Sequence, residues 1–151
     1  MINIDIHESF TLDIDPSSLI RAAEAVMNIQ KAGPNVDLTI VIEDNDKLHE
    51  LNYQFLGIDQ PTDVLSFPAN ETDPETGNLY LGDVIISYPM AQSQAAKADH
   101  PVDDELQLLV IHGVLHLLGY DHQEETEKEF MWAIQNSLIK QLNLSIHSLP
   151  E

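Results

Sequence analysis

Residues 102–122 read VDDELQLLVIHGVLHLLGYDH, and this stretch decides the fold. Its middle part, LQLLVIHGVLHLL, is apolar on every side of a helix, which is typical of a helix in the centre of a protein. We therefore expect a buried helix from Val102 to Leu118. Gly119 is well placed to end it, because glycine adopts the left-handed conformation of a helix end without strain.

The segments around this helix alternate between strand and helix patterns. Ile2, Ile4 and Ile6 alternate with polar residues, which predicts a half-buried strand over residues 2–7. Segments 63–68 and 79–87 are expected to form a hairpin around the turn-rich loop 70–78, with a right-handed crossover as the alternative. The chain is therefore expected to be one α+β domain over residues 1–151. Its other predicted elements are a strand at 36–43 and helices at 16–32, 45–55, 89–98 and 124–142.

The composition restricts the kind of protein. Six Lys and Arg residues face 26 Asp and Glu residues, so the formal net charge is −20, and such a surface repels polyanions. The absence of cysteine excludes disulfides, cysteine nucleophiles and cysteine-type zinc sites. No apolar run reaches the length of a membrane span, and the N-terminal MINIDIHESF lacks the pattern of a signal peptide. We expect a soluble, cytoplasmic protein.

Three histidines have the spacing of a metal site. His112 and His116 are four residues apart and share one face of the helix, and the turn at Gly119 lets His122 reach the same ion. Three imidazoles leave a fourth position open, which is the catalytic rather than the structural pattern for zinc. We predict one zinc ion per chain, although nickel, copper and iron also accept all-nitrogen ligation.

The same spacing occurs in metzincin proteases, in which a glutamate general base follows the first histidine. Gly113 occupies that place here, which argues against peptide hydrolysis by that route. Glu105, seven residues before His112, is the candidate for a base or for a hydrogen-bond partner of a ligand histidine. Alternatively, Glu105 stabilises the first turns of its helix through the helix dipole. Four further histidines are interpreted as surface residues: His7, His49, His100 and His147.

Two motifs resemble the YbeY family of bacterial endoribonucleases and rRNA maturation factors. They are HGVLHLLGYDH at residues 112–122 and LNYQFLGIDQPTDVLSFP at residues 51–68, and the resemblance spans roughly residues 40–140. It implies a mixed four-stranded sheet flanked by helices, and a zinc ion held by the three histidines in a cleft. It also implies metal-dependent cleavage of single-stranded RNA, in maturation of the 16S rRNA 3′ end and in ribosome quality control.

One position departs from the family pattern. Many members carry an arginine directly after the aromatic residue of the second motif, where it is thought to contact the RNA backbone. Here that position is Leu56, so the arginine's role cannot be carried over. In the same motif, Thr62, Asp63 and Ser66 are expected to line the substrate cleft, the alternative being that they serve turn geometry.

Three functions therefore compete. The first, which we expect, is a metal-dependent endoribonuclease that acts on single-stranded RNA, including rRNA. The second is a metalloprotease-like hydrolase that uses Glu105 as its base. The third is an acidic ribosome-assembly factor without catalysis, which docks on basic ribosomal proteins through complementary charge. The expected partners are thus RNA and the ribosome or its proteins, and no membrane.

Overall fold

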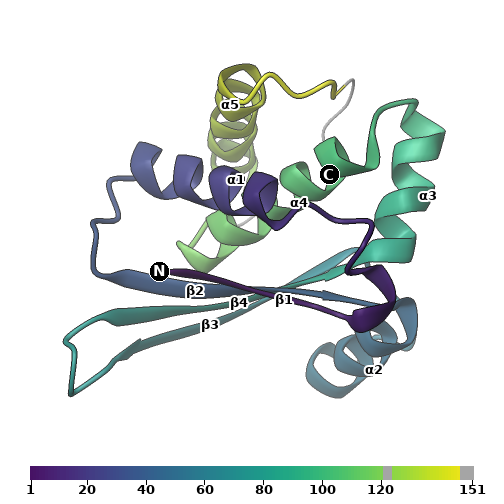
Figure 1. The fold of residues 1–151 in the computed structure, drawn as a ribbon. Coiled ribbons are helices and arrows are strands. Elements are labelled where there is room, and N and C mark those ends of the chain that lie inside the picture. The colour runs from purple at the N-terminus through teal and green to yellow at the C-terminus, as the bar shows by residue number, and fades with distance from the viewer. Residues whose placement is uncertain (121–123, 147–151) are drawn as a thin grey trace.

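The structure, a computed structural model, describes residues 1–120 and 124–146. Within these residues the chain forms one four-stranded β-sheet, five α-helices and a short 3-10 helix (Figure 1). The sheet contains both parallel and antiparallel pairs. The predicted α+β fold with a mixed four-stranded sheet is therefore confirmed.

The sheet has a hairpin at one edge. Its strands are β1 (Ile2–Ile6), β2 (Val36–Glu43), β3 (Val64–Thr72) and β4 (Leu79–Ser87). The order across the sheet is β1-β2-β4-β3, with β1 and β4 parallel to β2 and with β3 antiparallel to β4. The predicted hairpin is confirmed, and the crossover alternative is wrong. Strand β3 therefore has one edge that no other strand of the sheet covers.

Strand β3 continues beyond the predicted end at residue 68, as far as Thr72. Its register against β4 shifts between Pro68 and Glu71, and Asn70 in this interval has a positive φ of 50°. Such a bulge interrupts the alternation of side chains without ending the pairing, and asparagine tolerates the left-handed conformation. The alternation of apolar and polar residues therefore does not predict that the strand continues after Pro68.

The helices begin and end close to the predicted positions. They are η1 (Glu8–Phe10), α1 (Pro16–Ile29), α2 (Asn45–Leu56), α3 (Tyr88–Ala98), α4 (Val102–Leu117) and α5 (Glu125–Gln141). The Asp44 side chain caps α2 by accepting from the backbone N–H of Lys47 at 2.9 Å, and Gly57 ends it with a φ of 71°. None of the helices in the described ranges combines the length and the apolar character needed to cross a membrane.

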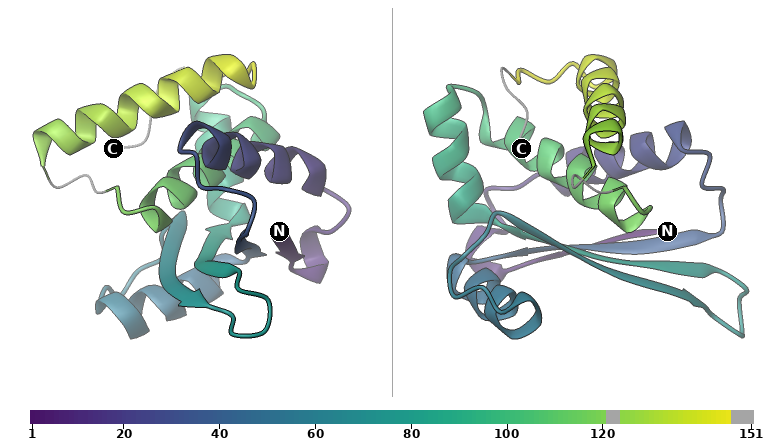
Figure 2. Two further views of the ribbon diagram at one scale, coloured as in Figure 1. Left: turned by 90° about the vertical axis from the view of Figure 1, so that its left-hand side faces the viewer. Right: turned by 180° about the vertical axis from the view of Figure 1, so that it is seen from behind.

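Helix α4 lies in the middle of the protein. Helices α1, α3, α4 and α5 lie on one side of the sheet, and α2 lies on the other side near one end (Figures 1 and 2). Helix α4 contacts α1, α3 and α5 as well as strands β3 and β4. Every residue from Glu105 to Leu115 is buried. The expected central helix is therefore present, and it carries His112 and His116.

A glycine sets the distance between α4 and the sheet. A Cβ atom on Gly113 would lie 2.4 Å from Cγ1 of Val84 on β4, well inside van der Waals contact. The hydroxyl of Ser66 on β3 donates to the carbonyl oxygen of Gly113 at 2.9 Å. The backbone of α4 therefore rests directly on β3 and β4 at the residue that follows His112.

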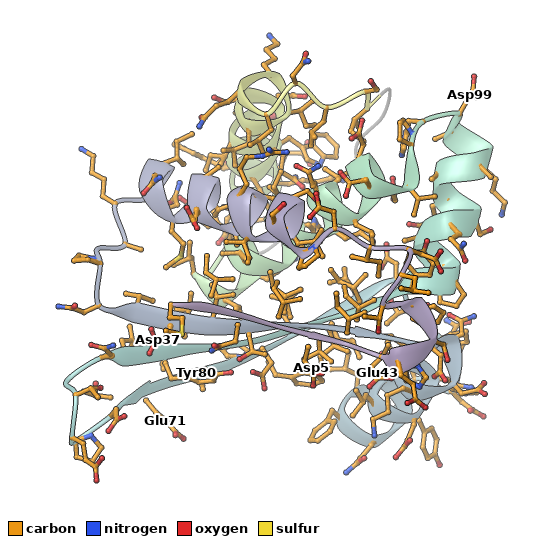
Figure 3. The ribbon with its side chains drawn as sticks, viewed as in Figure 1. Asp5, Asp37, Glu43, Glu71, Tyr80 and Asp99 are labelled. Carbon is orange, nitrogen blue, oxygen red and sulfur yellow. The ribbon has the colours of Figure 1, made fainter. Side chains whose placement is uncertain are left out.

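The other face of the sheet is acidic. Alternation along β1 and β2 directs Asp5 and Asp37 away from the helices, and Figure 3 shows them with Tyr80 on the side of the sheet opposite α1. The hydroxyl of Tyr80 donates to Asp83, and burial followed by this hydrogen bond raises the pKa of Tyr80 above its ordinary value. None of the four strands contains a lysine or an arginine. This face is therefore mainly anionic, and the cation that pairs with Asp37 is the N-terminal ammonium of Met1, 2.5 Å from its carboxylate.

Replacing Gly113 by alanine is expected to lower the free energy of unfolding by about 1–3 kcal/mol, because the new methyl group forces α4 away from Val84. Helix propensity alone predicts the opposite sign, a gain of about 1 kcal/mol. Urea unfolding measures the difference. In a background of Val84→Ala, which removes the opposing methyl groups, the same change should be neutral or stabilising. A Gly113→Ala protein as stable as the wild type would show that the close contact is not present.

Candidate metal centre

His112 and His116 meet at their ring nitrogens. Nε2 of His116 lies 3.1 Å from Nε2 of His112, and the two ring centroids are 4.7 Å apart. Two nitrogen ligands of a tetrahedral zinc ion stand about 3.3 Å apart, because each Zn–N bond is about 2.0–2.1 Å long. The two imidazoles therefore have the spacing of two ligands of one ion.

A glutamine from α5 orients the first of these rings. Gln135 is fully buried, and its Oε1 lies 3.4 Å from Nδ1 of His112. Because an amide oxygen accepts, Nδ1 carries the proton of the neutral ring and Nε2 presents its lone pair towards His116. A partner of this kind, on the nitrogen remote from the ion, is the usual support of a metal-binding histidine.

The sequence did not identify Gln135. Helical spacing within residues 124–142 predicts an apolar side that includes Phe130, Trp132, Ile134, Leu138 and Ile139, but Phe130 is largely exposed. Leu138 is buried as predicted and Ile134 packs against the core, but the fully buried stripe of α5 consists of Met131, Gln135 and Leu138. These positions follow the spacing i, i+4, i+7, and a polar residue inside such a stripe is the signal that could have marked Gln135.

The two histidines open into a cavity of 280 Å³ between α4, the edge strand β3 and the end of α2. Its lining residues are Leu56, Val64, Leu65, Ser66, Pro68, His112 and His116. Ser66, one of the predicted cleft residues, is among them, and its hydroxyl is bonded to Gly113. The edge strand and the histidine helix thus form two walls of one hollow.

Thr62 and Asp63 lie just before β3, and neither lines this cavity. One oxygen of the Asp63 carboxylate accepts from the backbone N–H of Val64 at 2.8 Å, and the other accepts from the side chain of Gln94 on α3 at 3.3 Å. These bonds fix the start of β3 and hold it to α3, as the turn-geometry alternative requires. A role of Thr62 and Asp63 in a substrate cleft stays a prediction.

His122, the third predicted ligand, lies outside the described residues. Within residues 1–120 and 124–146, no group of three His, Cys, Asp or Glu side chains is gathered to hold a metal ion. The described part of the site therefore supplies two imidazoles at ligand spacing, with one of them already oriented. This donor set fits zinc, and the identity and presence of the ion stay predictions.

The structure contradicts the surface position expected for His100. Its side chain is 2% exposed, and its Nε2 lies 2.5 Å from Oε2 of Glu105, whose side chain is 8% exposed. Asp99 ends α3 in a left-handed conformation with a φ of 58°, which turns the following residue back towards α4. A sequence pattern does not reveal this reversal, because Asp99 is not a glycine.

Glu105 is therefore paired with His100 rather than with a histidine of the candidate metal site. Seven residues of helix separate it from His112, an axial distance of about 10 Å. Burial raises the pKa of the Glu105 carboxyl, the bond to His100 lowers it, the charge of Asp63 raises it, and the net shift is upward. The structure does not bring Glu105 together with His112 and His116, and its catalytic role stays a prediction.

The surface positions expected for His7 and His49 are confirmed only in part. His49 is exposed, and its Nε2 lies 2.7 Å from the Asp59 carboxylate. His7 is partly buried, and its Nδ1 accepts from the backbone N–H of Ser9 at the start of η1. His147 lies outside the described residues.

Comparison with known proteins identifies relatives over most of the chain. A family model described as Endoribonuclease YbeY matches residues 4–143. The Endoribonuclease YbeY of Dehalococcoides mccartyi is 39% identical over 153 aligned residues, which cover 93% of this chain and 89% of that protein. The Endoribonuclease YbeY of Pelotomaculum thermopropionicum is 42% identical over 130 residues, which cover 84% of this chain and 86% of that protein.

A solved structure shares the fold. The solution structure of TM1509 from Thermotoga maritima superimposes with a TM-score of 0.62 at 30% sequence identity, over 94% of this chain and 89% of the other. The predicted resemblance is therefore confirmed, and it extends beyond the segment 40–140 in which the motifs lie.

The buried pair of His100 and Glu105 can be tested by a double-mutant cycle. Either His100→Ala or Glu105→Ala should lower the free energy of unfolding by about 3–5 kcal/mol, because each leaves a buried polar group without its main partner. The double variant should lose at least about 1 kcal/mol less than the sum of the single changes.

The exposed pair of His49 and Asp59 is the matched control, and His49→Ala should change stability by no more than about 1 kcal/mol. Additive effects of the His100 and Glu105 changes would contradict the pairing described above.

Proposed function

We propose that this chain, which belongs to the YbeY family of endoribonucleases, cleaves single-stranded RNA with the help of one zinc ion bound by His112, His116 and His122. The observation that carries the proposal is the approach of Nε2 of His112 and Nε2 of His116 to 3.1 Å at the wall of a cavity. The family supplies the class of reaction, and the two imidazoles supply the place where it would occur.

When bound, one such ion lowers the pKa of a water molecule and polarises a phosphoryl oxygen. The chain's own residues prepare the site for it. Gln135 fixes the proton of His112 on Nδ1, so that the lone pair of Nε2 is the one that would bind the ion, and the contacts of Gly113 with Val84 and Ser66 fix α4 against the sheet. The histidines are thus held in place before any substrate binds.

The size of the cavity favours a single strand. Its volume of 280 Å³ is just below the range of about 300–1,000 Å³ that holds a whole drug-sized ligand. A phosphodiester with its neighbouring groups fits such a space, whereas a duplex holds its backbone in a regular helical curve and cannot bend one phosphodiester into the hollow.

The metalloprotease-like alternative is less well supported. A glutamate at position 113 would have to occupy space already filled by Val84, so the protease base has no room at its usual place. Glu105, the substitute, is bonded to His100 and stands about 10 Å along the helix from His112. Both facts favour chemistry that does not need a glutamate beside the first ligand.

We also propose that the protein acts in the cytoplasm on rRNA, in maturation of the 16S 3′ end and in ribosome quality control. The net charge of −20 opposes binding through RNA phosphates but suits basic ribosomal proteins. The acidic sheet face, with Asp5 and Asp37 and without lysine or arginine in its strands, is the surface that would meet them. A non-catalytic role in assembly would use this same face.

His116→Ala is expected to abolish stoichiometric zinc binding and to lower single-stranded RNA cleavage by more than about 100-fold, because a direct ligand contributes more than a supporting residue does. Metal analysis and cleavage of a labelled oligoribonucleotide measure the two effects. His7→Ala, just after β1 on the opposite edge of the sheet from β3, is the control and should leave both unchanged. Full cleavage by His116→Ala, or cleavage that persists in a strong chelator, would overturn the proposed function.

Gln135→Leu, which keeps the volume but removes the acceptor, should weaken zinc affinity by about 10–100-fold. Gln135→Glu keeps an acceptor for Nδ1 of His112 and should retain the affinity. A competition titration against a zinc-binding dye measures both variants. Equal affinities of the wild type and Gln135→Leu would show that the contact with His112 does not support the ion.

A further inference from the structure

A group of large apolar side chains is exposed beside the cavity. Tyr53, Phe55 and Leu56 at the end of α2 are 61%, 58% and 59% exposed, and Ile58 just beyond the helix is 42% exposed. We call these four residues the α2 patch. Exposed apolar residues that gather in this way mark an interaction site, whereas scattered ones are normal at a protein surface.

The α2 patch is held rigidly. After Gly57 the chain folds back on α2, where the backbone N–H of Ile58 donates to the carbonyl oxygen of Asn52 at 3.3 Å. The buried side chain of Asn52 donates to the carbonyl oxygen of Gln60 at 2.8 Å. His49 and Asp59 close the same loop at 2.7 Å. A ligand that binds here therefore meets a surface that is already ordered.

The α2 patch is continuous with the candidate metal centre. Leu56 belongs both to the patch and to the lining of the cavity that His112 and His116 share. The ring of Phe55 packs edge-on against Phe67 of β3, with centroids 5.1 Å apart and an interplanar angle of 62°. Phe67 alternates along the edge strand with the cavity residues Ser66 and Pro68, so its ring lies on the other face of β3, and Leu56 is the residue that joins the patch to the cavity.

The charges near the α2 patch decide what kind of contact it can make. The one cation within α2 is Lys47, which lies 3.7 Å from Glu50 in the first turns of the helix, and position 56 is a leucine. A nucleic-acid strand cannot be held here mainly through its phosphates. Exposed aromatic rings instead offer stacking surfaces to bases, which requires no positive charge.

We propose that the α2 patch, with the exposed ring of Phe55 as its stacking surface, is a platform for unpaired nucleobases of the RNA strand whose backbone enters the cavity. This inference rests on the proposed function and adds to it the way in which the strand is held. Stacking on side chains requires bases that are free of a duplex, so the platform selects single strands. Affinity should depend only weakly on salt, because few phosphates are neutralised.

The test compares Phe55→Leu with Phe55→Trp, using a single-stranded oligoribonucleotide and zinc-loaded protein. Phe55→Leu should raise KM by about 10-fold, because a leucine has no ring for a base to stack on. Its kcat and zinc content should stay within about twofold of the wild type, and its unfolding midpoint should stay within a few degrees. Phe55→Trp should keep or lower KM, since indole stacks at least as well. Phe130→Leu, which removes an equally exposed ring from α5, is the matched control and should leave KM unchanged.

Two results distinguish a wrong stacking platform from a wrong proposed function. If the wild type cleaves RNA and Phe55→Leu has the same KM, the platform is wrong and the endoribonuclease proposal stands. If no RNA is cleaved, a binding measurement tests the platform by itself. An uncleavable 2′-O-methyl oligonucleotide should quench the fluorescence of Phe55→Trp when it is single-stranded and not when it is paired to its complement. Equal quenching by the duplex, or binding of neutral lipid vesicles in place of oligonucleotides, would overturn the platform.

Discussion

The contact between the backbone of α4 and strands β3 and β4 at Gly113 is the constraint on which the rest of the structure depends. Helix α4 is surrounded on all sides, so its neighbours have to approach closely, and a Cβ at position 113 would lie 2.4 Å from Val84. The same contact fixes the rotation of the helix about its axis. With that rotation set, His112 and His116 open into the cavity between α4 and β3.

Several polar groups inside this apolar setting are held by specific partners. His112 is oriented by Gln135 from α5, and Ser66 is bonded to the backbone of Gly113. The pair of His100 and Glu105 sits near the other end of α4, closed off from solvent. A buried pair of this kind contributes less to stability than its short distance suggests, because both groups lose their hydration. Its clearest consequence is geometric, since it joins the turn after α3 to α4.

The surface divides into regions of different chemistry. The sheet face that carries Asp5 and Asp37 has no lysine or arginine in its strands, whereas the α2 patch beside the cavity is apolar and aromatic. These two regions explain how a protein with a net charge of −20 could bind a polyanionic substrate. The RNA strand would be bound through its bases at the α2 patch, and the acidic face would contact basic partners. Leu56, which departs from the family pattern, belongs to the apolar region.

Features encoded by local patterns could be predicted from the sequence, and features created by packing could not. The apolar run before Gly119 predicted α4, and Asp44 and Gly57 marked both ends of α2. The role of Gln135 depends on the packing of α5 against α4, and that of His100 depends on the chain reversal at Asp99. Neither produces a periodic pattern in the sequence. The sequence shows at Leu56 only the absence of a positive charge, whereas its place beside exposed aromatic residues depends on the fold.

The central claim is that His112 and His116 bind one zinc ion, and zinc K-edge X-ray absorption of the zinc-loaded protein tests it most directly. The account predicts one ion per chain, coordinated by nitrogen and oxygen at about 2.0–2.1 Å, with the outer-shell scattering of at least two imidazoles. A protein that takes up no stoichiometric zinc, or a spectrum without imidazole scattering, would contradict it.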